Sequence, residues 1–204
     1  MFAGSVTADE RIRRDGRIRL FCALRLPDAT VDELVAWQAA HLQPEHLQGE
    51  HLQGEHPVAV RIVPPEHLHI TLAFLGSRPA EEVPTIVGEL AAAARGAGEI
   101  RLRATGYRET RSVGMVVLDD PAGAATAFAA DVGERLERLG VYRREQRPWL
   151  PHITVLRFAE PPRLRPPVPD LGEVDVVRAS LYSSSLRPGG ARYDALETVV
   201  LGGR

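Results

Sequence analysis

The chain has 204 residues, of which 44% are hydrophobic and 25% are charged, a composition typical of a soluble globular protein with one domain or two small lobes. Its formal net charge is −2, so no global basic field indicates nucleic-acid binding, and an anionic ligand would need a local arginine cluster. All 25 basic residues are arginine, which excludes a lysine nucleophile, a P-loop lysine and a lysyl-nucleotide ligase. Cys22 is the single cysteine, which excludes disulfides within the chain and cysteine-rich zinc sites.

The first residues of the chain are polar and carry arginines, and they lack the apolar stretch of a signal peptide. No run of about 18 apolar residues is present, so no membrane span is predicted. We therefore expect a disordered N-terminal extension over 1–17, followed by a single domain over 18–204. The protein is expected to be cytoplasmic and monomeric, without membrane contact.

The first half of the chain alternates strand and helix patterns. A strand is predicted over 17–26, and Thr30 with Glu33 forms a capping box for a helix that extends to residue 40. Val31, Leu34 and Val35 give that helix an apolar stripe. The elements that follow are predicted as a strand over 58–63, a strand over 67–75 and a helix from after Pro79 to Gly96.

The second half repeats this mixture of elements. The predicted strands are 100–106, 113–118, 149–158, 174–185 and 193–201, the predicted helix is 124–139, and the proline-rich segment 161–169 is predicted as a loop. Gly140 is expected to end the helix. The pattern indicates an α+β fold with antiparallel sheets and helices on their outer faces.

Residues 41–56 form a low-complexity repeat with a period of five, in which His-Leu-Gln-Gly-Glu and close variants recur. This period fits neither the helical nor the strand period, so it does not place the histidines together as metal ligands. Histidine-rich tracts can bind metal, and that reading stays open. The simpler reading is a tandem duplication inserted in a surface loop, where extra length costs little.

Two identical triplets stand 83 residues apart, His69-Ile70-Thr71 and His152-Ile153-Thr154. In a strand, residues i and i+2 point to the same face, so each triplet presents an imidazole and a hydroxyl together, with isoleucine behind them. One His-x-Thr means nothing alone because threonine is a common strand residue. Two copies in similar positions of two half-chains indicate one cleft lined by both.

His67 competes with His69, because a strand over 67–75 would point both side chains to the same face. The second triplet decides between them. When the two copies are aligned, His69 meets His152, whereas His67 meets Leu150. We therefore predict that His67 is a neighbour of the site and not a catalyst.

Two histidines and two threonines, with an arginine and without metal ligands, suit in-line cleavage of a phosphodiester. Imidazole titrates near pH 6.5, so one neutral and one protonated histidine can coexist near neutral pH and act as base and acid. Threonine hydroxyls can donate to phosphate oxygens, and arginine can bind phosphate in a bidentate manner. No Asp/Glu cluster for magnesium and no G-x-S-x-G elbow accompanies the triplets.

The sequence resembles the 2H phosphoesterase superfamily, and within it the RNA 2′,3′-cyclic phosphodiesterases, historically called 2′-5′ RNA ligases (LigT/ThpR-like). The resemblance extends from about Arg19 to the C-terminus. Beside the triplets it rests on the segments 19–24, 69–76, 151–157 and 181–186 and on Arg192-Tyr193. The repeat and the N-terminal extension depart from the family pattern.

The resemblance implies a bilobal fold of two pseudo-symmetric halves, whose antiparallel sheets line a central cleft with helices outside. It implies hydrolysis of RNA 2′,3′-cyclic phosphate ends to 2′-phosphates without metal or cofactor. His69 would be the proton donor and His152 the proton acceptor, while Thr71 and Thr154 would bind phosphate oxygens.

Two further site residues follow from the same resemblance. Arg157 stands where the family carries a phosphate-binding arginine, but it lies five positions after His152. Strict alternation would then point the two side chains to opposite faces, so Arg157 needs a β-bulge or the end of the strand to reach the phosphate. Phe21 is expected either to contact a base or to belong to the core.

Three other functions stay open at the level of sequence. The same residues could join RNA ends by the reverse reaction, or they could act on a small cyclic nucleotide. A nucleotide-binding module without catalysis would be expected to have lost one histidine, and both are present. The repeat histidines could instead make the protein a metal binder.

Overall fold

The computed structural model describes residues 16–42, 60–187 and 190–202. The extension 1–17 therefore lies almost wholly outside the described residues, and so does the repeat 41–56 except for its first two residues. The helices are α1 (Asp28–His41), α2 (Val83–Gly96) and α3 (Ala124–Arg138), with 3₁₀ turns at Pro65–His67 and Ala80–Glu82. The strands are β1 (Arg17–Arg25), β2 (Val60–Ile62), β3 (His69–Pro79), β4 (Ile100–Glu109), β5 (Val113–Asp119), β6 (His152–Phe158), β7 (Val174–Val176), β8 (Arg178–Arg187) and β9 (Gly190–Val200).

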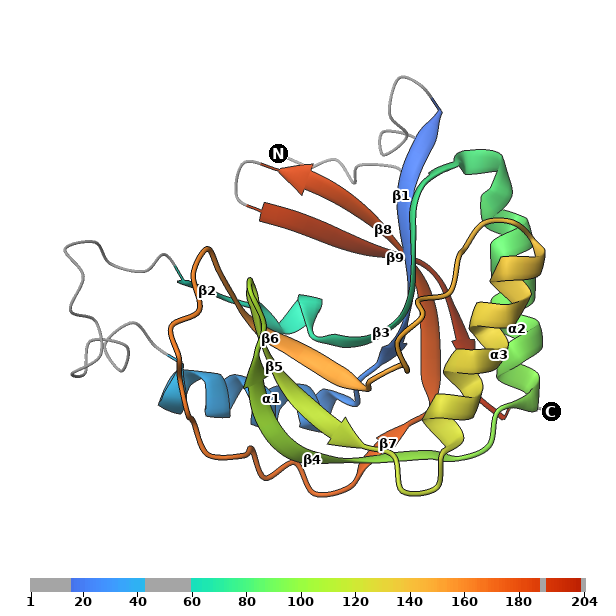
Figure 1. Cartoon of the computed structure of the whole chain (residues 1–204). Coiled ribbons are helices and arrows are strands. Elements are labelled where there is room, and N and C mark those ends of the chain that lie inside the picture. The colour runs from blue at the N-terminus through green and yellow to red at the C-terminus, as the bar shows by residue number, and fades with distance from the viewer. Residues whose placement is uncertain (1–15, 43–59, 188–189, 203–204) are drawn as a thin grey trace, which may run out of the picture.

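The strands of the described residues form one strongly curled, antiparallel sheet (Figure 1). Their order is β7-β4-β5-β6-β3-β1-β8-β9, and β2 pairs with β6. The sheet divides between β6 and β3, which share the single register pair Ile70–Ile153. One lobe therefore holds β1, β3, β8 and β9, and the other holds β2, β4, β5, β6 and β7. The predicted α+β, bilobal architecture is confirmed.

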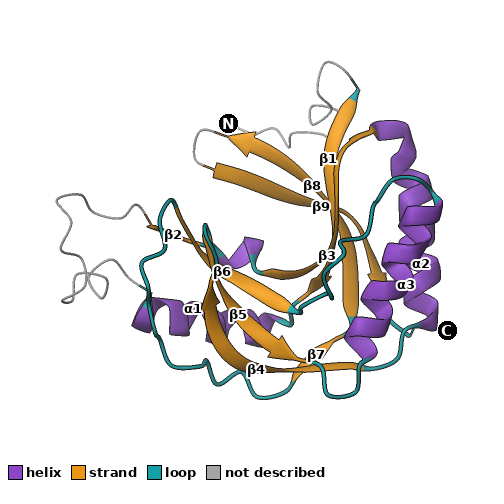
Figure 2. Cartoon of the chain, viewed as in Figure 1, coloured by secondary structure: helices purple, strands orange, loops and turns teal. Residues whose placement is uncertain are grey.

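The lobes do not follow the two halves of the sequence, because each half lends elements to the other lobe. Helix α1 follows β1 but packs beneath β6, where its Gln38 donates a hydrogen bond to the Val155 carbonyl. Strands β8 and β9 come last in the chain but extend the sheet beyond β1. Helices α2 and α3 lie side by side outside that lobe (Figure 2).

The core follows from strands that are apolar on both faces. β1 is flanked by β3 and β8, and five consecutive residues within it are buried, from Leu20 to Leu24. The helices bury one face each. On α2 this face is Ile86, Leu90, Ala93 and Ala94, and on α3 it includes Phe128, Val132 and Leu136. Burial of this apolar surface is the main stabilising term of the fold.

The predicted capping box of α1 is wrong. The helix begins at Asp28, and Pro27 occupies the N-cap position without a side-chain hydrogen bond. Thr30 therefore lies inside the first turn and is buried, and the stripe is shifted so that Val35 is 36% exposed. Proline fixes φ near −65°, and Asp28 places a negative charge at the positive end of the helix, so the pair Pro27-Asp28 starts the helix three residues earlier than the capping box predicts.

Several predicted strands have different bounds, and the strands predicted over 100–106 and 193–201 are Ile100–Glu109 and Gly190–Val200. The strand predicted from residue 67 begins at His69 and continues past Gly76 to Pro79, and the strand predicted from residue 149 begins at His152. The strand predicted over 174–185 is divided at Val177 into β7, which pairs with β4, and β8, which pairs with β1. The helix predicted from after Pro79 begins only at Val83, after the 3₁₀ turn Ala80–Glu82, and ends at Gly96 as predicted. The helix predicted over 124–139 ends at Arg138, and the proline-rich segment 161–169 is a loop as predicted.

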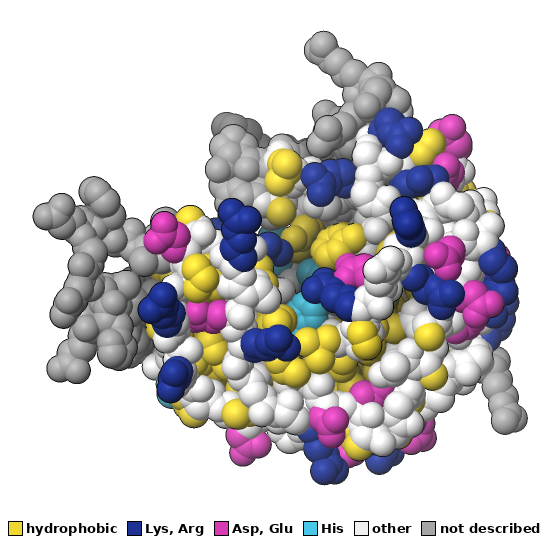
Figure 3. Space-filling view, viewed as in Figure 1, with side chains coloured by type: hydrophobic (Ala, Val, Ile, Leu, Met, Phe, Trp, Pro, Cys, Tyr) yellow, Lys and Arg dark blue, Asp and Glu magenta, His cyan; other side chains and the backbone are white. Residues whose placement is uncertain are grey.

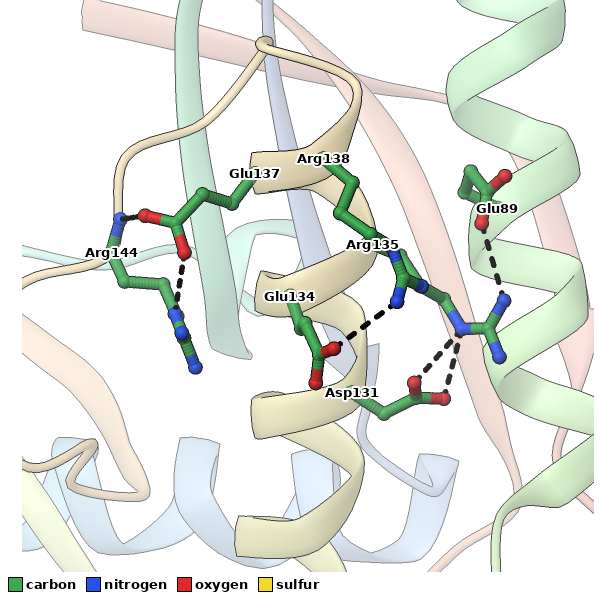
Figure 4. A network of polar contacts seen from close by, with 7 residues as sticks. All are labelled: Glu89, Asp131, Glu134, Arg135, Glu137, Arg138 and Arg144. Carbon is green, nitrogen blue, oxygen red and sulfur yellow. Dashed lines mark hydrogen bonds and ion pairs between the residues drawn. The ribbon is translucent and has the colours of Figure 1, made fainter.

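The two outer helices are joined by ion pairs (Figure 4). Arg135 of α3 donates to Asp131 one turn earlier and to Glu89 of α2. Arg144 donates to Glu137 and so ties the chain after α3 back to that helix. These partly exposed pairs orient the helices and add little stability each. Within the described residues, no helix is long and apolar enough to span a membrane.

Candidate active site

The sheet brings the two predicted triplets together at the seam between the lobes. Ile70 and Ile153 pair directly across β3 and β6, and both are fully buried. The residues on either side of each isoleucine are half-buried and point to the opposite face of the sheet. That face carries His69, Thr71, His152 and Thr154. The prediction that both triplets line one site is therefore consistent with the register.

Each motif histidine is held in the same way. His69 Nδ1 lies 2.7 Å from the His67 carbonyl oxygen, and His152 Nδ1 lies 2.8 Å from the Leu150 carbonyl oxygen. A carbonyl only accepts, so both Nδ1 atoms carry the proton. This fixes the tautomer and leaves Nε2 of each ring without a hydrogen-bond partner among the described residues. The two rings are thus prepared alike for proton transfer at Nε2.

His69 is surrounded by aromatic rings. The ring centroids of Phe21, Tyr193 and Tyr182 lie 5.0, 5.6 and 6.1 Å from the imidazole. The pKa of His69 is lowered to about 4, mainly by burial and also by the charge of Arg157, while the hydrogen bond to the His67 carbonyl acts in the opposite direction. In the free protein this imidazole is therefore neutral at pH 7.

His67 does not share the strand of His69, contrary to the prediction. It ends the 3₁₀ turn Pro65–His67, and its imidazole lies 4.5 Å from the ring of Tyr193. The proline pair 64–65 favours this turn before the strand begins. The predicted role of His67 as a neighbour agrees with this position, and its contribution to the site is the main-chain carbonyl that orients His69.

A β-bulge resolves the alternation problem of Arg157. Gly114 pairs with Leu156 and Met115 pairs with Thr154, which leaves Val155 as the extra residue on β6. Val155 and Leu156 are both fully buried, so the alternation shifts by one. Arg157 is half-buried on the face that carries His152 and Thr154.

A buried glutamine on α1 holds this bulge. Gln38 is 3% exposed, and its Nε2 donates to the Val155 carbonyl at 2.9 Å and to the Val63 carbonyl at 3.1 Å. The backbone N–H of Val63 donates to the same Val155 oxygen. Gln38 therefore links the bulge of β6 to the residue that follows β2. No sequence pattern indicates this role, since a lone glutamine in a helix is usually a surface residue.

The first triplet strand carries an equivalent bulge. Thr71 pairs with Ala23 and Ala73 with Cys22, so Leu72 is the extra residue of β3. The alternation shifts in the same way, and Phe74, which is 63% exposed, takes the position on β3 that Arg157 takes on β6. Sequence reasoning missed Phe74. Comparison of the two triplets at matched spacing, five residues after each histidine, could have found it.

Phe21 is a core residue in this structure. Its ring is 1% exposed and stacks on Tyr182 at a centroid distance of 5.0 Å, with Tyr193 and Phe74 also in contact. The ring has no free face for a base, and it packs against the imidazole of His69. Of the two roles left open by the sequence, the structure shows the core role.

A second cross-lobe link involves Trp149, which precedes the second triplet. Its indole Nε1 donates to the Thr71 carbonyl at 2.9 Å. This hydrogen bond ties the approach to β6 to the main chain of the first triplet, near the seam where β3 and β6 share one register pair. A half-buried tryptophan with a satisfied N–H fixes such contacts well.

The face that carries the histidines is hollowed (Figure 3). Histidine side chains lie at the bottom of this hollow, and arginine and apolar side chains gather around it. Among the described residues, no group of three or more His, Cys, Asp or Glu side chains is arranged to hold a metal ion. The donors at the site are hydroxyl, imidazole and guanidinium groups, which suit a phosphate.

Comparisons with known proteins agree with this geometry. The family model described as LigT like Phosphoesterase matches residues 26–114. The RNA 2′,3′-cyclic phosphodiesterase of Escherichia coli is 31% identical over 180 residues, which are 88% of this chain and 94% of that protein. The protein of the same name from Thermus thermophilus is 33% identical over 154 residues, which are 69% of this chain and 75% of that protein.

Solved structures extend the likeness to the fold. The crystal structure of E. coli LigT complexed with 3′-AMP has a TM-score of 0.73 at 26% identity, and the match covers 92% of this chain and 99% of that one. A crystal structure from T. thermophilus has a TM-score of 0.69 at 31% identity and covers 91% of this chain and 99% of that one. Sequence identity, coverage and fold together show that this chain belongs to the LigT-like phosphoesterase family.

Proposed function

We propose that this protein hydrolyses the 2′,3′-cyclic phosphate at the end of an RNA to a 2′-phosphate, using two histidines and no metal ion. One observation carries the proposal. Two identical His-Ile-Thr triplets meet at Ile70–Ile153, and each histidine has Nδ1 fixed by a carbonyl and Nε2 without a partner among the described residues. The substrate class is supported by the names of the E. coli and T. thermophilus relatives.

The reaction is an in-line displacement at phosphorus. His152 Nε2 takes a proton from water while the water oxygen forms a bond to phosphorus. The bond between phosphorus and O3′ breaks, and His69 Nε2 gives its proton to O3′. The products are a 2′-phosphate and a free 3′-hydroxyl. Proton transfer of this kind typically contributes 10²–10⁴-fold at each site.

The acid role of His69 depends on the bound substrate. Burial keeps this imidazole neutral in the free protein, where its pKa is about 4. A phosphodiester anion beside the ring favours the imidazolium and raises the pKa, so substrate and proton bind together. Arg157 opposes this effect through its charge, and neutralisation of Arg157 by the phosphate removes the opposition.

Thr71, Thr154 and Arg157 bind the phosphate oxygens. The two hydroxyls flank the seam from both lobes, and the bulge at Val155 brings the guanidinium to the same face. Charge-assisted contacts of this kind are stronger than those between neutral groups, and they matter most where negative charge develops on the oxygens in the transition state.

The test is incubation of an oligonucleotide that ends in a 2′,3′-cyclic phosphate with the protein in EDTA, followed by identification of the product. A 2′-phosphate formed at a rate unchanged by EDTA supports the proposal, and His152→Ala is the inactive control. A 3′-phosphate product, or loss of activity in EDTA, contradicts it. An added RNA with a 5′-hydroxyl end tests joining. Water at about 55 M should outcompete that end unless the site holds it in place.

A further inference from the structure

Arg61 of β2 and Arg157 of β6 lie directly opposite each other in the sheet. Opposite residues of an antiparallel pair project from the same face, with side chains in contact range. Arg157 is on the face of the two triplets, so Arg61, which is exposed, extends that face by one strand. Strand β5 pairs with one edge of β6. On the other edge, β3 pairs with β6 only at Ile70–Ile153, and β2 pairs with the part of β6 that follows.

Two like charges placed opposite each other destabilise a sheet unless something neutralises them. Within residues 16–42, 60–187 and 190–202, neither Arg61 nor Arg157 has a hydrogen bond or ion pair from its guanidinium. Arginines of the outer helices contrast with this pair, since Arg135 and Arg138 meet carboxylates on their own or neighbouring turns (Figure 4). Two cations that have no carboxylate partner among the described residues and lie beside the histidines indicate an anionic ligand that contacts both.

The positive charges of these arginines affect the pKa values of the nearby histidines. Burial lowers the pKa of His67, and the charges of Arg61 and Arg157 lower it further, against Glu66 and Asp194. The charge of Arg157 also acts on His69. The side chains of Arg157 and Arg61 therefore form a short cationic strip next to the catalytic histidines. The strip crosses from β6 to β2 beside the 3₁₀ turn Pro65–His67.

We propose that Arg61 binds the internucleotide phosphate next to the cyclic phosphate of an RNA end, while Arg157 serves the cyclic phosphate itself. This inference rests on the proposed function. A 2′,3′-cyclic phosphate closes the 3′ end of its strand, so the next phosphate can lie only on the 5′ side. A cyclic mononucleotide has no such phosphate. The strip therefore makes the site selective for oligonucleotide ends over cyclic mononucleotides.

The experiment compares a nucleoside 2′,3′-cyclic phosphate with a dinucleotide that ends in the same group, using wild type, Arg61→Gln and Arg95→Gln. Arg95 is an exposed arginine on α2, outside the site, and serves as the matched control. The readout is kcat/KM for each substrate as a function of salt. For wild type we expect the dinucleotide to be the better substrate. Arg61→Gln should reduce its advantage about tenfold, equivalent to about 1.4 kcal/mol.

The salt dependence gives a second readout. Loss of one phosphate contact should reduce the slope of log kcat/KM against log salt for the dinucleotide by about 0.7. Arg61→Lys should retain most of that slope because it keeps the charge, and it serves if Arg61→Gln does not fold. An unchanged advantage in Arg61→Gln, or an equal loss in Arg95→Gln, overturns the inference. If wild type hydrolyses neither substrate, the proposed function itself fails.

Discussion

Ile70 and Ile153 face each other across the seam between the lobes, and each is the central residue of a His-Ile-Thr triplet. Both side chains are fully buried, so they cannot rotate outward without opening the core. The pair sets the spacing of the two histidines and the two threonines on the opposite face. The geometry of the site is thus a property of the sheet and not of a loop, which favours precise positioning of the reacting groups.

The first prediction concerns the three histidines near the seam. His69→Ala and His152→Ala should each lower kcat for cyclic phosphate hydrolysis by 10²–10⁴-fold, because each removes one proton transfer. His67→Ala should change kcat by less than about tenfold, since the main-chain carbonyl that orients His69 is retained. Steady-state kinetics on one cyclic substrate decide the matter. An equal loss at His67 would show that its imidazole, and not only its carbonyl, acts in the reaction.

The second prediction concerns stability in acid. Burial lowers the pKa of His69 from 6.5 to about 4 in the folded protein, so below pH 6.5 the unfolded chain takes up a proton that the folded protein does not. This component of stability is therefore complete above pH 6.5 and is lost as the pH falls to 4. Its full size is about 3 kcal/mol. Urea unfolding at pH 7 and pH 4.5 should show a larger loss for wild type than for His69→Gln, and equal losses would contradict the buried, neutral imidazole.

The third prediction concerns phosphate and the same histidine. An anion bound beside His69 should raise its pKa, and linkage then requires that inorganic phosphate bind more tightly as the pH falls toward 5. Titration of the imidazole resonances with and without phosphate measures the shift directly. The resonance that is missing from the spectrum of His69→Gln is assigned to His69. A pKa of His69 that does not move on phosphate binding would place the anion elsewhere.

The fourth prediction concerns Gln38. Gln38→Met keeps the volume but leaves the buried carbonyls of Val63 and Val155 without the amide donor, which should cost about 1–3 kcal/mol of unfolding free energy. The bulge also directs Arg157, so activity should fall as well. In a double-mutant cycle with Arg157→Ala, the losses in kcat/KM should be less than additive. Strictly additive losses would show that Gln38 does not affect kcat/KM through the Arg157 guanidinium.

The fifth prediction concerns the five-residue repeat, which lies outside the described residues except for His41 and Leu42. Its period fits neither helix nor strand, so we expect it to be silent in the chemistry. Deletion of residues 46–55, two whole repeat units, should leave hydrolysis of a small cyclic nucleotide within a few-fold of wild type. Loss of activity in a folded deletion variant would make the repeat part of the site.

Much of the site could be predicted because the same His-Ile-Thr triplet occurs twice in the sequence. The duplicated triplet predicted one site around His69 and His152 and put His67 aside. The sheet brings the two triplets together at Ile70–Ile153, and His67 lies in a turn and not in the strand that was expected. Strand alternation predicted that Arg157 needs a β-bulge or the end of the strand to reach the face of His152, and β6 has a bulge at Val155. The repeated triplet and the two-residue period of a strand can both be recognised in the sequence without knowledge of distant contacts.

The remaining parts depend on contacts between distant segments. Nothing near Gln38 in the sequence shows that it holds Val155, 117 residues away. The burial of Phe21 depends on Tyr182 and Tyr193, which come from the end of the chain. The packing of α1 against β6 of the other lobe also depends on such contacts between distant segments. The helix start at Asp28 was missed for another reason, because proline and aspartate at the terminus outweighed the Thr30 pattern.

The two bulges have a consequence for which ester bond of the substrate is cleaved. The two triplets meet on antiparallel strands at the pair Ile70–Ile153, and a cyclic phosphate carries O2′ and O3′ in nearly equivalent places. The triplets offer the same imidazole and hydroxyl groups to either orientation of the ring, but their surroundings differ, since aromatic rings enclose His69. Beyond the bulges the equivalence ends, because β3 presents the exposed ring of Phe74 where β6 presents the charge of Arg157. Under the proposed activity, we expect this mismatched pair to help orient the substrate so that O3′ meets His69.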